Sequence, residues 1–362
     1  MLSNAGLLKR DPFRVCVVGK LSNLYRRSKM RKHSFIFAAS CISFFLFSLA
    51  LPSPATCAEP IVLKWASFIP KGGPETATLQ KYFVDKVVER SKGELQIEFR
   101  GGPEAISPVS LGAAVQKGVV DFCMIIVGFY EAIVPGVNAL MLTQLTPQEE
   151  RVTGAHDFIV KLHQEHGLMF LGRAAPSYEP AFYTYLNKRV EKPQDFTSIR
   201  LGAGPAARAA SLAWGAKVVP VNNVSEYYTS MERGLYDGLS SVPLVTWVSL
   251  GCHEVTKYII DHPYYQSTMV AVMNLNSWNK LPKHLQELIN QVMTEYPKLA
   301  MDEQAKRLAE ARKKAEAAKV EFYKFKPEVA DWFLQTAYKA AWDYQQERFP
   351  EVTPKLKKIL SK

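Results

Sequence analysis

The sequence predicts an α/β fold of two lobes. From about residue 60 onward, short apolar runs of the kind found in strands alternate with segments whose apolar residues recur at helical spacing. This alternation favours parallel or mixed sheets covered by helices. About 300 residues follow the N-terminal leader, more than one hydrophobic core usually serves, so we expect two lobes.

The N-terminus predicts secretion. Residues 30–33, Met-Arg-Lys-His, form a basic segment. Residues 34–51 form an apolar run of 18 without a charge, and small side chains at Thr56 and Ala58 follow. This order is typical of a signal peptide, here residues 30–58 with cleavage after Ala58. We expect residues 1–29 to be a non-native leader from an early start codon, because Met30 is the better start.

Two other interpretations of the N-terminus stay open. An uncleaved anchor fits because 18 apolar residues reach the lower limit of about 18 for a membrane span. A lipoprotein anchored through Cys57 fits less well, because residues 54–56 lack the leucine that such a motif carries.

Charge and cysteine content argue against two classes of protein. The net charge is +11, but residues 1–58 hold 9 of the 45 basic and 1 of the 34 acidic residues, which leaves 36 and 33, a net of +3. Nucleic-acid binding needs a dense basic face, so we expect no nucleic-acid partner. Only Cys123 and Cys252 remain after residues 1–58 are removed, and two cysteines are too few for a disulfide scaffold. Whether they pair stays open, with buried free thiols expected.

Residues 59–178 are expected to form the first part of the first lobe. Its strands and helices should alternate in this order: strand 61–68, helix 76–90, strand 94–99, helix 107–117, strand 119–127, helix 147–166 and strand 168–173. A strand at 182–186 then enters the second lobe, residues 179–266, and a strand at 268–273 returns to the first. Two crossings make a hinge, which lets lobes close on a ligand.

The last part of the chain is predicted to be helical. Residues 283–319 read as one long helix or two abutting ones around Pro297, so residues 267–307 should belong to the first lobe. The charge run at 303–319 is typical of a solvated helix face. Residues 308–362, with amphipathic segments at 327–348 and 354–360, are expected to pack on the second lobe.

Residues 199–238 carry the main functional signal. Arg200 lies in a short apolar run, and Gly204 and Pro205 then open an alanine-rich helix. A second apolar run at 217–221 leads to a helix at 226–233 and a strand at 236–239. We therefore expect a lone cation at a strand end, facing a helix N-terminus, which suits an organic anion.

This segment resembles the signature of the solute-binding proteins of tripartite ATP-independent periplasmic (TRAP) transporters, of the dicarboxylate-binding type. The matching residues are Arg200, Gly215, Ala216, Pro220, Glu226, Tyr228, Gly234, Asp237 and Gly238. Further runs match at residues 101–104, 118–122, 253–258 and 278–282, so that the resemblance covers roughly residues 60–350.

The resemblance implies a two-lobed periplasmic binding protein fold with hinge strands and a long helix that spans both lobes. It implies a receptor that captures an organic acid and delivers it to the TRAP membrane permease, without enzymatic activity or a cofactor. Arg200 matches the carboxylate-binding arginine of the family. A metal ion that accompanies the ligand stays open.

Aromatic residues are the second expected ingredient of the site, because apolar walls are typical of small-molecule pockets. Those near predicted strand ends or crossings are Trp65, Phe129, Tyr130, Tyr178, Phe182, Trp214 and Trp247. Trp247 and Tyr130 are preferred from their positions relative to the cleft of the family, with Phe129, Trp65 and Tyr178 beside them. Core packing is the alternative for each residue.

The sequence departs from the family pattern in two places. After Asp237 and Gly238, many members carry Gln-Glu-Asn-Pro, whose Asn contacts the ligand; here residues 239–243 read Leu-Ser-Ser-Val-Pro. Ser240 and Ser241 can still donate hydrogen bonds. The second basic residue that some members carry near Ala181 is absent. These departures favour an acid with fewer polar groups than a sugar acid or a C4-dicarboxylate.

Other chemistries have less support. Residues 202–207 fit G-x-G-x-x-A, but the next strand ends at Val221 before two asparagines, with no acidic residue for a ribose. His163 and His166 lack a third metal ligand nearby. The alternative functions are a secreted enzyme acting on a small carboxylic acid and a ligand-sensing partner of a signalling receptor.

Overall fold

The computed structural model describes residues 59–174, 180–221, 226–266 and 269–362. The leader, the signal peptide and Tyr178 lie outside these ranges, whereas residues 58–362 form one compact unit. Within the described ranges, no helix is both long and apolar enough to cross a membrane.

The first lobe is built on a five-stranded sheet in the order β2-β1-β3-β10-β4. Its strands are β1 (Ile61–Ser67), β2 (Leu95–Phe99), β3 (Phe122–Ile126), β4 (Leu168–Arg173) and β10 (Met269–Asn274). The first three run parallel, and β10 is antiparallel to both β3 and β4. The four strands other than β10 therefore share one direction.

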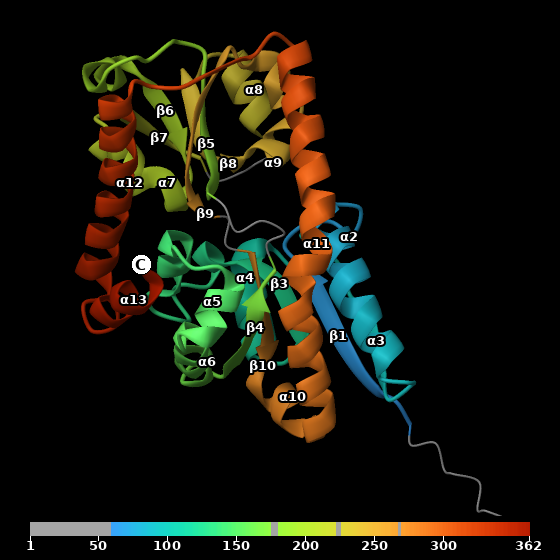
Figure 1. Ribbon diagram of the computed structural model, residues 1–362. Helices are drawn as coiled ribbons and strands as arrows, with labels where there is room; N and C mark the ends of the chain where they lie inside the picture. The colour runs from blue at the N-terminus through green and yellow to red at the C-terminus, as the bar shows by residue number, and fades with distance from the viewer. Residues whose placement is uncertain (1–58, 175–179, 222–225, 267–268) are drawn as a thin grey trace, which may run out of the picture. The chain divides into compact units, whose positions relative to one another are not determined.

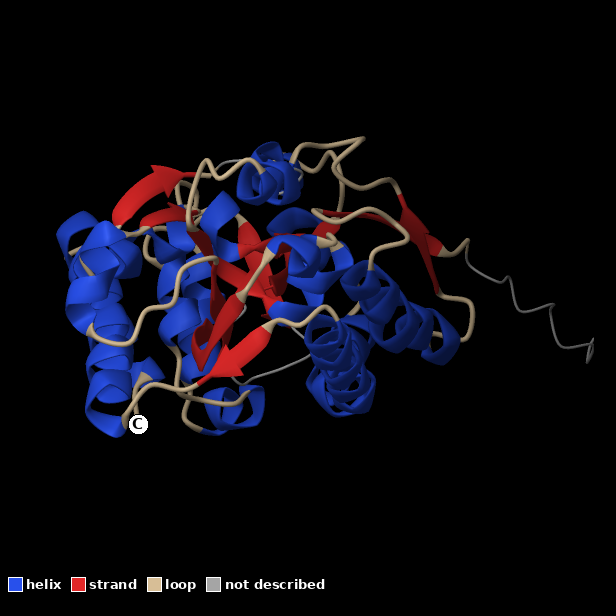
Figure 2. Ribbon diagram, turned by 90° about the horizontal axis from the view of Figure 1, so that it is seen from above, coloured by secondary structure: helices blue, strands red, loops and turns tan. Residues whose placement is uncertain are grey.

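The molecule has helices on both sides of its strands (Figure 2), and several of these helices belong to the first lobe. They are α2 (Pro74–Leu79), α3 (Asp85–Arg90), α4 (Pro108–Gln116), α5 (Pro147–Val152), α6 (Ala155–Gln164) and α10 (Leu275–Lys280), with 3₁₀ turns η3 (Val127–Phe129) and η4 (Val137–Leu142). Two predicted helices differ in detail. A π-helical turn, η2 (Gln80–Val84), joins α2 to α3, and Gly154 at φ 78° separates α5 from α6, a backbone angle that glycine adopts readily.

The second lobe is built on a six-stranded sheet in the order β11-β9-β5-β8-β6-β7. Its strands are β5 (Pro180–Leu186), β6 (Arg200–Ala203), β7 (Lys217–Pro220), β8 (Gly238–Pro243), β9 (Tyr258–Gln266) and β11 (Glu321–Tyr323). Only β5 is antiparallel to its neighbours. The helical segments are η5 (Pro193–Ser198), α7 (Pro205–Ala213), α8 (Tyr227–Glu232), α9 (Leu244–Ser249) and η7 (Cys252–Val255).

The two crossings fix which edges of the sheets face each other. The chain leaves the first lobe at the carboxyl end of β4 and enters the second at the amino end of β5. It returns from the carboxyl end of β9 to the amino end of β10. Because β5 and β10 are the antiparallel strands of their sheets, the carboxyl ends of all other strands lie on the side of the crossings.

Three helices form most of the C-terminal part of the chain: α11 (Lys283–Ala317), α12 (Pro327–Arg348) and α13 (Thr353–Leu360). The long helix α11 packs on α3 and β4 of the first lobe and on α9 of the second, as the resemblance implied (Figure 1). The expectation that the C-terminal helices pack on the second lobe needs correction. Helix α12 contacts α7 and η4, one from each lobe, and α13 contacts η4 of the first lobe.

Candidate ligand-binding site

Arg200 is the first residue of β6, at the edge of the second sheet that points away from the crossings. Its Nε and Nη2 donate to the two carboxylate oxygens of Asp237, each at 3.1 Å, and Nη2 also donates to the carbonyl of Gly234 at 2.9 Å. Lys188 adds a second ion pair to Asp237 at 2.9 Å. The guanidinium is thus already held by the protein.

This geometry corrects part of the sequence prediction. Arg200 is not a lone cation, and it does not face the following helix, because α7 begins at Pro205, after the other end of β6. The guanidinium beside Asp237 holds the pKa of that carboxyl well below its usual range, which shows a satisfied pair. The ligand-binding role of Arg200 stays a prediction, and its position lends it no support.

Trp65 and Trp247 lie in hydrophobic cores. Trp65, on β1, is fully buried and stacks on Phe122 with ring centroids 5.7 Å apart. Trp247, on α9, stacks on Tyr185 at 4.1 Å, and its indole N–H donates to Thr256 Oγ1 at 3.0 Å. Both side chains pack within their lobes, and Trp65 Nε1 has no hydrogen-bond partner among the described residues. Their role as ligand contacts stays a prediction.

Tyr130 is also buried, below the carboxyl end of β3. Its hydroxyl donates to His163 Nε2 at 3.0 Å, because His163 Nδ1 donates to the carbonyl of Ile159 at 2.7 Å. Burial lowers the pKa of His163 to about 4, so the ring is neutral near pH 7, as this hydrogen-bond arrangement requires. This pair links α6 to the segment that follows η3, and it occupies the polar atom that a ligand would use.

Among the predicted aromatic residues that the structure describes, Phe129 is the one that remains accessible. It closes η3, directly after β3, and 36% of its side chain is exposed. Its ring lies 6.3 Å from that of Phe68, which directly follows β1. Phe129 therefore lies at the edge that faces the second lobe. Ser241 lies in β8, but its side chain is outside the described part of the structure, as is the whole of Tyr178.

Two residues at the crossings were missed from the sequence. Arg173 ends β4, and its Nη1 donates to Gln266 Oε1, at the end of β9, at 2.6 Å. Arg173 also donates to the carbonyl of Leu145 at 2.6 Å and pairs with Glu150, 3.3 Å away. All of these side chains are buried. The only sequence signal was an arginine in an otherwise apolar strand.

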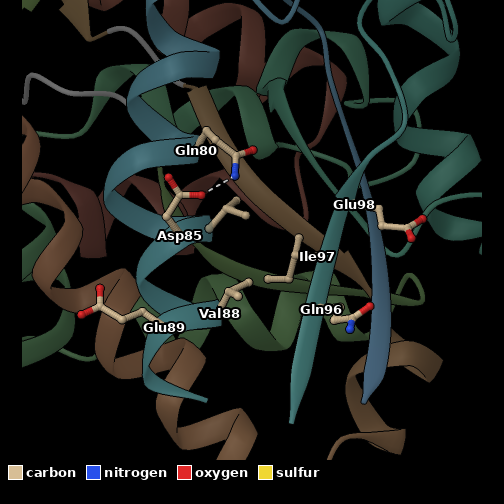
Figure 3. A pocket seen from close by; sticks show the side chains of 8 residues that line it. Gln80, Asp85, Val88, Glu89, Gln96, Ile97 and Glu98 are labelled. Carbon is tan, nitrogen blue, oxygen red and sulfur yellow. Dashed lines mark hydrogen bonds between the residues drawn. The ribbon is translucent and has the colours of Figure 1, made fainter. Parts of the chain in front are cut away.

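A separate depression lies away from the facing edges, between the helical segment of Gln80 to Glu89 and the edge strand β2 (Figure 3). Its acidic side chains already have partners: Asp85 accepts from Gln80 at 2.6 Å, Glu89 from Lys86 at 2.7 Å and Glu98 from Arg100 at 3.1 Å. Each of these carboxylates therefore already accepts a hydrogen bond from the protein.

Neither metal chemistry nor a disulfide is apparent in the described ranges. No group of three or more His, Cys, Asp or Glu side chains there could hold a metal ion. Cys123 and Cys252 are free and buried, one in each lobe. Burial raises the pKa of Cys252 to about 12, so its thiol is protonated and unreactive near neutral pH.

Two α/β sheets that face each other across two strand crossings define a two-lobed binding protein, the class in which hinge closure encloses a ligand. Residues 66–348 match the bacterial extracellular solute-binding proteins of family 7, and the chain belongs to that family. It is a TRAP-type solute receptor and not an enzyme.

Two relatives show how far the sequence has diverged. An uncharacterized protein of Haemophilus influenzae is 33% identical over 101 residues, which are 27% of this chain and only 30% of that protein. A solute-binding protein of Albidiferax ferrireducens is 22% identical over 272 residues, 71% of this chain and 78% of the relative.

Solved structures agree on the fold. A TRAP periplasmic solute-binding protein from Desulfovibrio salexigens, with bound orotic acid, gives a TM-score of 0.70 at 18% identity, over 83% of this chain and 97% of that one. One from Sulfitobacter sp. NAS-14.1, with bound β-D-galacturonate, gives 0.67 at 17% identity, over 83% and 99%.

Proposed function

We propose that the protein captures an organic acid between its two lobes in the periplasm and delivers it to a TRAP membrane permease. The arrangement of the two sheets supports the proposal. The carboxyl ends of most strands in each sheet lie at the edge that faces the other lobe, so a ligand between these edges touches both lobes. Only a ligand with more contacts in the closed state shifts the equilibrium toward closure. Two relatives of the same fold bind orotic acid and galacturonate, both carboxylic acids.

The second lobe supplies a feature that suits an anion. Helix α7 begins with Pro205 at the carboxyl end of β6, so its N-terminus lies at the edge that faces the first lobe. No side chain caps it, since Gly204 occupies the N-cap position. Unpaired N–H groups and the helix dipole favour a carboxylate at such an end.

The ligand should carry fewer polar groups than a sugar acid or a C4-dicarboxylate. Arg200 is committed to Asp237, and Arg173 to Gln266, Leu145 and Glu150. Leu239, Ser240 and Ser241 stand where many members carry polar ligand contacts. A dicarboxylate would bring a second negative charge, and burying an unpaired charge is costly.

Thermal unfolding with a panel of mono-, di- and keto-acids tests the function. A ligand at 100 times its dissociation constant stabilises the folded state by about 2.7 kcal/mol, which raises the unfolding midpoint measurably. One acid class should raise it and neutral sugars should not. No shift with any acid would reject an organic-acid receptor.

The same panel with Arg200→Ala tests the residue that the sequence singled out. We expect the ligand-induced shift to survive, because Arg200 lies at the far edge of its sheet, roughly 10 Å along β6 from the facing edge at about 3.3 Å per residue. Loss of the shift, with the free protein still folded, would restore Arg200 as the carboxylate-binding residue.

Export and delivery need separate tests. N-terminal sequencing of the protein from the periplasmic fraction should give Glu59 as the first residue if cleavage follows Ala58. An uncut chain in the membrane fraction would support the anchor instead. Uptake of the bound acid into permease-containing vesicles should require this protein.

A further inference from the structure

The strand order of the first lobe singles out one place on its facing edge. In the order β2-β1-β3, the chain moves from β1 to β2 on one side and then to β3 on the other. The order thus reverses between β1 and β3. In open α/β sheets, ligands bind outside the carboxyl ends of the strands at such a point.

Phe68 and Phe129 occupy this point: Phe68 directly follows β1, and Phe129 ends η3, the turn that follows β3. Their rings are tilted by 53° at a centroid separation of 6.3 Å, so they contact without covering each other. Among the phenylalanines that the structure describes, Phe129 is the one that ranks as exposed. An exposed phenyl face costs free energy in water, and a flat ligand that stacks on it recovers that cost.

Asn138 supplies a polar group at the same place. It lies in η4, is only 7% exposed, and its Oδ1 has no hydrogen-bond partner in the described ranges. A Cβ built on Gly128, the residue before Phe129, would lie 3.5 Å from this oxygen. The amide therefore lies against the glycine of η3. A buried amide oxygen without a partner is unfavourable, because it has lost its hydrogen bond to water, so such an atom calls for an explanation.

The position of η4 brings this amide toward the second lobe. The turn packs on η3 and also on β9, the strand that ends at the crossing, and on α12. Asn138 thus joins the two phenylalanines at the edge where a ligand would touch both lobes. The amide presents an acceptor in Oδ1 and donors in Nδ2, so it can pair with either kind of ligand group.

We propose that Asn138, Phe68 and Phe129 form the half of the ligand site that the first lobe contributes, and that they select a flat, sparsely hydroxylated organic acid. This rests on the proposed function. The flat body stacks on Phe129, and Asn138 hydrogen-bonds one polar group of the ligand. A sugar acid would bury several hydroxyl groups against two phenyl rings and a single amide, where most would lack partners.

Calorimetric titration with orotate and pyroglutamate as flat acids, and galacturonate and glucuronate as hydroxylated ones, tests the proposal. The variants are Asn138→Leu, which keeps the size but removes the amide, and Phe129→Leu. Each should weaken flat-acid binding about tenfold or more, the effect of losing about 1.4 kcal/mol. Asn138→Asp should weaken it further, because a carboxylate would repel the acid.

Asn187→Leu is the matched control. Asn187 Oδ1 also lacks a hydrogen-bond partner among described residues, but Asn187 follows the carboxyl end of antiparallel β5, at the edge away from the first lobe. Its substitution should leave affinity within about twofold, a change that corresponds to less than 0.5 kcal/mol. Unfolding midpoints of the free variants show that each is folded.

Three results would overturn the inference. Hydroxylated acids that bind while flat acids do not would reject the ligand class and leave the organic-acid function standing. Flat acids that bind Asn138→Leu as tightly as the unaltered protein would reject the site. No binding by any acid would remove the proposed function together with this inference.

Discussion

Arg173 and Gln266 join the two chain crossings directly, through a 2.6 Å hydrogen bond from the guanidinium to the amide oxygen. One residue ends β4 and the other ends β9, so the strand that leaves the first lobe is tied to the strand that leaves the second. Glu150 balances the charge of Arg173 within the first lobe. A direct side-chain hydrogen bond therefore links the two crossings.

Removing Arg173 should destabilise the protein strongly. In Arg173→Leu, Glu150 stays buried without its cationic partner, and breaking a buried pair in this way costs about 3–5 kcal/mol. Urea-induced unfolding measures the loss. Arg90→Leu is the control, because Arg90 pairs with Glu295 at the surface, where such pairs contribute about 1 kcal/mol or less. Equal losses in both variants would contradict the assigned role of the buried pair.

Asp237 should make stability depend on acid pH. In the folded state, Arg200 holds the pKa of Asp237 well below its usual range. The ion pair therefore stabilises the protein fully above the pKa of the unfolded chain, near 4, and this stabilisation is lost as pH falls toward the pKa of the folded state. Asp237→Asn should therefore be less stable than the unaltered protein at pH 7, with a difference that shrinks below about pH 4. A difference that stays constant from pH 7 to pH 3 would exclude the ion pair as its cause.

Much of the fold could be predicted because it follows from local pattern. Strand β4 and helix α12 have the predicted bounds, since an unbroken apolar run and a proline-opened amphipathic repeat are strong local signals. Strand β9 was missed because Asp261, His262 and Pro263 interrupt its apolar run. Its central pairing with β5 is a tertiary effect that overrides local propensity.

The site could be predicted less well because its residues are defined by distant partners. Arg200 looks unpaired until β6 and β8 bring Asp237, 37 residues later, beside it. Trp65 and Trp247 are aromatic residues of the kind that line ligand pockets, but the same residues also fill hydrophobic cores, and the sequence does not distinguish the two roles. Asn138 gave no local signal, because an unsatisfied amide exists only once the fold has buried it.

Two buried histidines should make the protein sensitive to mild acid. Burial lowers the pKa of both His156 and His163 to about 4, against 6.5 for the ordinary ring. Between these values the unfolded chain binds up to two protons more than the folded one, so unfolding free energy falls as pH falls, by at most about 2.7 kcal/mol per pH unit. In His156→Gln this slope should drop by about half. An unchanged slope from pH 6.5 to pH 5 would contradict the assignment.

The C-terminus of α11 offers a stabilising substitution. Lys319 follows the helix with φ 65°. Its backbone N–H donates to the carbonyl of Glu316, and the N–H of Val320 donates to the carbonyl of Ala315, which is the pattern of a Schellman motif. This left-handed backbone disfavours side chains other than glycine, so Lys319→Gly should raise the free energy of unfolding by about 1 kcal/mol. Lys313→Gly, inside the same helix, should lower the free energy of unfolding by about 1 kcal/mol, because glycine loses more conformational entropy than lysine when it becomes helical. Urea unfolding of both variants measures the two signs, and a loss of stability in Lys319→Gly would show that the lysine side chain contributes more than the backbone angle costs.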